Sequence, residues 1–91
     1  MKFGIAWYRP EQWSRLLEIS ADREDLENTF AEWEQLATEK LRSLRAEGLQ
    51  VKKITVDVEK LLAWCLSRGL SVDSTARSQY VSEVLRKRNL H

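Results

Sequence analysis

Residues 22–48 read DREDLENTFAEWEQLATEKLRSLRAEG and form the longest uninterrupted helical pattern in the chain. Asp22 is the predicted N-cap, Asp25 supports it from the first turn, and Gly48 can take the left-handed conformation that commonly ends a helix. Apolar side chains recur between them at steps of three and four residues, which keeps them on one face; they are Leu26, Phe30, Trp33, Ala37, Leu41 and Leu44, with Leu36 widening the stripe. The pattern predicts one long amphipathic helix, and we expect the other elements to pack on its stripe.

This predicted helix is long for so small a protein. About 25 residues at roughly 1.5 Å each span roughly 36 Å, whereas a globule of 91 residues is only about 30 Å across. We therefore expect the helix to span the whole molecule or to project from it. A projecting apolar end would need a partner.

The composition describes an ordinary soluble protein of one domain, residues 1–91, with 43% hydrophobic and 32% charged residues. No apolar stretch approaches the roughly 20 residues of a membrane span. Arg9, Pro10 and Glu11 interrupt any signal-peptide core near the N-terminus. The single cysteine excludes an internal disulfide bond and favours a reducing compartment. We expect a cytoplasmic protein that does not enter the membrane.

The net charge of +1 hides an uneven distribution. Residues 1–40 hold five basic and nine acidic side chains, whereas residues 41–91 hold ten basic and five acidic ones. Chance and the placement of charges along helix dipoles are the simpler explanation of this difference. The alternative is a polar molecule with one basic face.

The rest of the chain predicts two strands and three further helices. Alternation of apolar and polar residues indicates strands at 2–8 and 51–57. Helical spacing indicates helices at 10–19, 58–67 and 74–88, with the last residues, Asn89 to His91, fraying. The order β-α-α-β-α-α predicts an α+β fold, mostly helical, in which helical hairpins pack on a minimal two-stranded sheet.

The ends of the later helices carry their own signals. Asp57 and Asp73 are predicted N-caps of the two C-terminal helices. Gly69 is the predicted end of the helix over 58–67.

Residues 6–13, AWYRPEQW, resemble the opening of a group of short bacterial proteins of unknown function. Several later residues are similar to the second half of those proteins; they are Leu62, Ala63, Trp64, Cys65, Gly69, Ala76, Arg77 and Tyr80. The resemblance covers most of the chain. It implies a bacterial, cytoplasmic setting and carries no activity.

The residues that commonly perform catalysis or bind metals are scarce. Cys65 and His91 are the only cysteine and histidine, which is too few for a zinc site within one chain. Cys65 shares an apolar stripe with leucines, so we expect a buried, unreactive thiol rather than a nucleophile. Glu11, Glu32 and Glu34 fit solvated helix positions. We expect no catalytic residue, metal or cofactor, and hence no enzyme.

Four side chains are candidates for an interface. Phe3, Ile5 and Trp7 lie on one face of the N-terminal strand, which carries no charge beyond Lys2 to protect its edge. Trp64 lies off the apolar stripe of its helix and either completes a packing contact or is exposed at an interface. A two-stranded sheet is marginal alone, so we expect a homodimer that pairs these edges. The competing outcome is a monomer whose own helices cover both edges.

Binding of nucleic acid is the alternative function. Arg77, Arg86, Lys87 and Arg88 of the last helix could meet phosphates. Gly69 partly fits the turn of a helix-turn-helix, although a plain helical hairpin fits the sequence better. The sequence thus favours a non-catalytic protein-interaction or self-association module with an unknown protein partner, over a small nucleic-acid-binding regulator.

Overall fold

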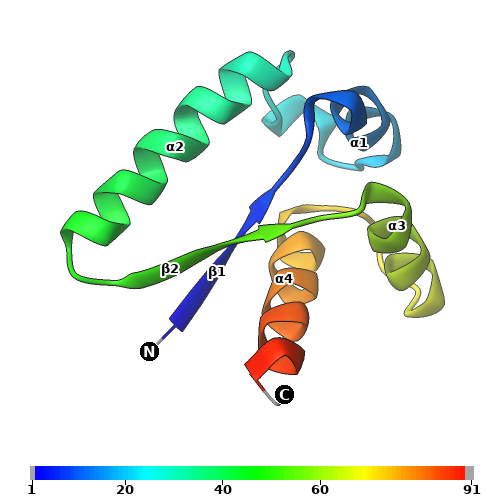
Figure 1. Cartoon of the computed structure of the whole chain (residues 1–91). Coiled ribbons are helices and arrows are strands. Elements are labelled where there is room, and N and C mark those ends of the chain that lie inside the picture. The colour runs from blue at the N-terminus through cyan, green and yellow to red at the C-terminus, as the bar shows by residue number, and fades with distance from the viewer. Residues whose placement is uncertain (1, 90–91) are drawn as a thin grey trace.

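The computed structural model describes residues 2–89 and has a mostly helical α+β fold (Figure 1). The elements follow in the order β1 (Lys2–Trp7), the 3-10 helix η1 (Pro10–Gln12), α1 (Trp13–Ile19), the 3-10 helix η2 (Arg23–Asp25), α2 (Phe30–Ala46), β2 (Gln50–Thr55), α3 (Val58–Ser67) and α4 (Ser74–Asn89). The predicted fold class and the order β-α-α-β-α-α are confirmed. α4 reaches one residue beyond its predicted end, and the expected fraying of Leu90 and His91 lies outside the described residues.

The sheet consists of β1 and β2, which run parallel in a register from Lys2 beside Gln50 to Trp7 beside Thr55. α1 and α2 form the connection between the two strands. α2 and α4 lie on opposite sides of the strands (Figure 1). Side chains of one strand alternate between the two faces, so the two strand faces meet different helices.

On the α2 side, Trp7 packs against Trp33 of α2 with ring centroids 5.1 Å apart. Lys53 of β2 covers the same Trp7 ring, with its ammonium nitrogen 4.1 Å from the ring centroid. On the α4 side, the space above the α-carbon of Gly4 is filled by Val81 and Leu85 of α4. Gly4 therefore lets α4 lie close to β1, which is the physical reason for a glycine inside this strand.

The main hydrophobic core lies on the sheet face that α4 covers, and α1 and α3 enclose it further. Its fully buried members include Leu16, Ile54, Leu61 and Cys65. α2 contributes no buried residue to this core and buries only Ala37 and Leu41 elsewhere. The expectation that the other elements pack on the stripe of the long helix is therefore wrong, because the strands and the two C-terminal helices supply most of the core.

The predicted start of the long helix at Asp22 is also wrong. Residues 23–25 form a single 3-10 turn, and Leu26 is extended, so the chain is not helical again until Phe30. Thr29 is the N-cap, because its hydroxyl oxygen accepts a hydrogen bond from the Glu32 amide at 3.2 Å. The Asp22 carboxylate binds Arg77 of α4 instead.

The corrected α2 has 17 residues, or about 26 Å at the α-helical rise per residue. This length fits inside a molecule whose extents are 34 × 32 × 20 Å. The expectation that the helix outruns the globule is therefore wrong. Within residues 2–89, no helix has the length and apolar character needed to cross a membrane.

The predicted helix ends after Asp22 are confirmed. Asp57 accepts hydrogen bonds from two amides in the first turn of α3, and Asp73 accepts one from Ala76 in α4. Gly48 and Gly69 have φ angles of +88° and +66°. Each is followed by a leucine amide that bonds back into the preceding helix, Leu49 to Leu44 and Leu70 to Cys65. These bonds define the Schellman motif.

Candidate functional site

An apolar hollow lies along the free edge of β1, between α2 and α4. Gly4, Ile5 and Ala6 of β1 line it together with Leu36 of α2 and Ser78 of α4, and its volume is about 550 Å³. We call this hollow the β1 groove. It follows the strand for most of its length, because Phe3 and Tyr8 also line it.

Backbone groups of β1 point into the β1 groove. The Trp7 carbonyl accepts a hydrogen bond at 3.0 Å from the amide of Val56, the residue that follows β2. Because successive peptide groups of a strand point in opposite directions, the N–H and C=O groups of Gly4 and Ala6 point away from β2. They therefore face the groove as donors and acceptors for another strand.

The outer edge of β2 is different. Arg45 at the end of α2 donates a hydrogen bond from Nη2 to the Val51 carbonyl at 3.0 Å. Lys52 and Lys53 follow, and charged side chains of this kind discourage strand pairing. The β2 edge is thus partly closed, whereas the β1 edge is open.

Exposed apolar side chains gather at the β1 groove. Among residues 2–89, five large apolar side chains are exposed, and Phe3, Leu36 and Leu49 of these line the groove. Leu36 alone is 52% exposed. Three of the five exposed large apolar side chains among residues 2–89 thus lie beside the open strand edge.

Arg77, which lines the β1 groove, belongs to an ion pair. Arg77 of α4 donates two hydrogen bonds to the Asp22 carboxylate, at 2.9 and 2.6 Å, and both side chains are largely buried. Tyr8 lies beside this pair, and burial raises the pKa of its phenol to about 12, although the Arg77 charge opposes the rise. The pair fixes α4 to the segment that follows α1.

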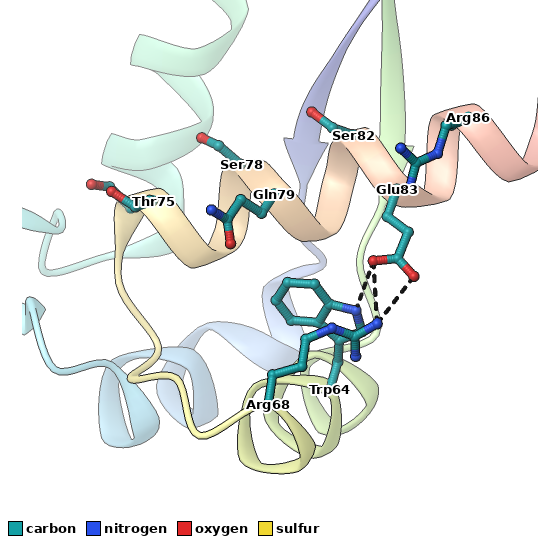
Figure 2. Close-up of a pocket in the computed structure, with 9 residues that line it drawn as sticks. Trp64, Arg68, Thr75, Ser78, Gln79, Ser82, Glu83 and Arg86 are labelled. Carbon is teal, nitrogen blue, oxygen red and sulfur yellow. Dashed lines mark hydrogen bonds and ion pairs between the residues drawn. The ribbon is translucent and has the colours of Figure 1, made fainter.

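A second hollow of about 700 Å³ lies between α3 and α4 and has a polar lining. Figure 2 shows Trp64 and Arg68 of α3 turned toward Glu83 of α4. The Glu83 carboxylate accepts a hydrogen bond from the Trp64 indole at 3.1 Å and pairs with Arg68 and Lys87, each at 3.3 Å. The polar groups of this cluster thus satisfy one another, and they fasten α3 to α4.

The structure separates the four predicted interface residues. Phe3 and Ile5 line the β1 groove, and Trp7 lies on the same strand face beneath Trp33 and Lys53. Trp64 lies apart from them, where its ring contacts Tyr80 at a centroid distance of 5.5 Å. The sequence predicts that Trp64 either completes a packing contact or is exposed at an interface. Within this chain it makes a packing contact with Tyr80.

The predicted nucleic-acid contacts are separated as well. Arg77 is engaged by Asp22, and only 11% of its side chain is exposed. Arg86, Lys87 and Arg88 are exposed on the last turns of α4.

No family model, curated protein or solved structure matches this chain. The resemblance of residues 6–13 to short bacterial proteins therefore stays a prediction. Within residues 2–89, no group of three or more His, Cys, Asp or Glu side chains is placed to hold a metal ion. The candidate functional site of this chain is the β1 groove.

Sequence reasoning missed two parts of the groove. The sequence pattern predicts Leu36 on the apolar stripe of a core helix, yet it is exposed. Ser74, Ser78 and Ser82 of α4 also line the groove, and their spacing of four residues was visible in the sequence as one small polar face. Which element that face meets depends on the tertiary fold.

Proposed function

We propose that this chain is a small non-catalytic protein-interaction or self-association module of the bacterial cytoplasm, and that the β1 groove is its binding surface. The observation that carries the proposal is the open edge of β1, whose Gly4 and Ala6 peptide groups face a groove between two helices. An added strand would gain main-chain hydrogen bonds from this edge. The exposed Phe3 and Leu36 would then select its side chains.

Site-specific photocrosslinking in living cells tests this proposal. A photoreactive amino acid replaces Leu36, which lines the groove, or Leu66, which is 69% exposed on α3 and does not line it. Irradiation should give a discrete crosslinked protein band from position 36 and none from position 66. Equal labelling at both positions, or no band from position 36, would contradict the proposal.

A small nucleic-acid-binding regulator is the second candidate, and the exposed Arg86, Lys87 and Arg88 favour it. The engagement of Arg77 by Asp22 and of Lys87 by Glu83 weighs against it, since two of the four predicted contacts already have a carboxylate partner. Fluorescence anisotropy with labelled duplex and single-stranded DNA at low salt decides the matter. The regulator should bind with an affinity that falls steeply as salt rises. An unchanged anisotropy with every probe would remove this candidate.

A further inference from the structure

The open edge of β1 is complementary to itself, because an antiparallel copy of the same strand offers the same donors and acceptors in reverse order. We propose that the occupant of the β1 groove is the β1 strand of a second copy of this chain, paired antiparallel about a two-fold axis at Ile5. This inference rests on the proposed function and names its partner. The result is a continuous four-stranded sheet with β1 of each copy at its centre.

The backbone geometry is compatible with this pairing. Gly4 and Ala6 present their N–H and C=O groups to the groove, as the Val56-to-Trp7 hydrogen bond requires. Centring the pair on Ile5 places Gly4 opposite the partner's Ala6, so each of these residues donates and accepts one hydrogen bond. Phe3, which is 42% exposed, then lies opposite the partner's Trp7 and is covered.

The charges of α2 fit the same arrangement. A two-fold axis perpendicular to the sheet places α2 beside the partner's α2, running in the opposite direction. Residues 30–38 hold two carboxylates and no cation, whereas residues 39–46 hold three cations and one carboxylate. Antiparallel packing therefore sets the acidic half of each helix against the basic half of the other, and it covers the exposed Leu36.

On the other face of the sheet, the same axis brings α4 beside the partner's α4. Ser74, Ser78 and Ser82 of α4 line both the β1 groove and the second hollow, and so lie between the two. Small side chains at a helix contact allow the shorter separations among the roughly 8–10 Å found between packed helices.

The exposed area is consistent with an unfilled interface. The chain exposes 6148 Å², whereas a monomeric protein of 10.7 kDa is expected to expose about 5,500 Å². The excess of roughly 600 Å² approaches the about 800 Å² that each partner buries in a standard interface.

Sedimentation and amide exchange on the unmodified protein test the pairing. The mass should rise from 10.7 kDa toward twice that value with concentration. The Gly4 and Ala6 amides, which have no strand partner within residues 2–89, should become protected over the same concentration range. A constant mass, or a dimer in which these two amides exchange freely, would overturn the inference.

Two substitutions test the register and the helix contact. Ile5→Cys should give a disulfide-linked dimer under mild oxidation, because residues on the axis of a non-hydrogen-bonded pair are about 4.5 Å apart. Thr55→Cys, on the same sheet face of β2, should not. Leu36→Glu should weaken dimerisation at least about tenfold, as expected for a residue at the centre of an interface, whereas Leu66→Glu should leave it unchanged.

The crosslinking experiment separates the two proposals. A band at twice the mass of the chain from position 36 supports both. A band of another mass, with a monomer in sedimentation, keeps the proposed function and overturns the second copy as the partner. No band and a constant mass contradict both.

Discussion

Gly4 lies where α4 crosses β1, and other side chains already fill the space above its α-carbon. A methyl group at this position would lie 2.8 Å from Cγ1 of Val81 and 3.0 Å from Cγ1 of Ile54. Gly4→Ala should therefore destabilise the protein by about 1–3 kcal/mol, the usual cost of overpacking, despite the better strand propensity of alanine. Urea unfolding measures this cost.

The control for this prediction is a double-mutant cycle. Val81→Ala removes the closest atom, so the two changes together should cost less than the sum of the two alone. Additive costs, or a Gly4→Ala protein as stable as the wild type, would show that the space above Gly4 does not limit the packing of α4.

Cys65 is a second residue whose behaviour follows from its position. Its side chain is fully buried in the main core, and burial raises the pKa of its thiol. Since the thiolate is the reactive form, a thiol reagent at neutral pH should label the native protein slowly and the urea-unfolded protein at once. The Leu66→Cys variant supplies the control, because position 66 is exposed on the same helix. That variant should show one fast and one slow thiol, and two fast thiols would refute the prediction.

At the scale of the element, the helix ends show what the sequence could predict. Each capping residue forms or permits hydrogen bonds within a few residues of itself, so the local sequence is enough to predict the helix end. This holds for Asp57, Asp73, Gly48 and Gly69. The sequence also carries the capping pair of Thr29 with Glu32 as a Thr-x-x-Glu pattern, which competes with the N-cap signal at Asp22.

Asp22 could not be assigned from local pattern, because its partner Arg77 lies 55 residues along the chain. The β1 groove could be predicted only in part for the same reason. An open strand edge carrying Phe3 and Ile5 followed from the strand count. The position of Leu36 and of the α4 serines beside that edge required the tertiary arrangement.

The Asp22–Arg77 pair links the start of η2 to α4. It also makes the free energy of unfolding depend on pH. Hydrogen bonding to Arg77 holds the pKa of Asp22 below its ordinary value, although partial burial opposes this. A lowered native pKa contributes stability above the unfolded pKa, near pH 4, and this contribution is lost as the pH falls through the native value. At neutral pH, Asp22→Asn should cost about 2–3 kcal/mol, because it weakens the charged bonds and leaves Arg77 unpaired.

Urea unfolding of both proteins between pH 7 and pH 2.5 checks this prediction. The difference between wild type and Asp22→Asn should shrink as the pH falls below about 4. Asp25→Asn, an exposed carboxylate in the same 3-10 turn, is the matched control and should cost little at any pH. A difference that stays constant down to pH 2.5 would show that the pair does not supply the stability.

At the scale of the whole molecule, the packing is uneven. The main core joins β2, α1, α3 and α4, whereas α2 buries only Ala37 and Leu41 and is held to the aromatic cluster by Trp33. Trp33 contacts the rings of Trp7, Tyr8, Trp13 and Phe30, all at centroid distances of 5.1–5.4 Å. One end of α2 is thus anchored, and the end that carries Leu44 flanks the β1 groove.

We expect this unevenness to appear as a local opening of α2. In native-state hydrogen exchange at concentrations where the protein is a single chain, amides in the second half of α2 should exchange through an opening of lower free energy than those of α3 and β2. Leu41→Ala should lower the free energy of α2 opening and the global free energy of unfolding by similar amounts, because Leu41 is packed only while α2 is closed. Leu61→Ala, in the main core, should cost about 2–5 kcal/mol globally. If the amides of α2, α3 and β2 instead exchange through one common opening, α2 belongs to the same cooperative unit as the core. The two helices that line the groove, α2 and α4, would then both be rigid before any partner binds.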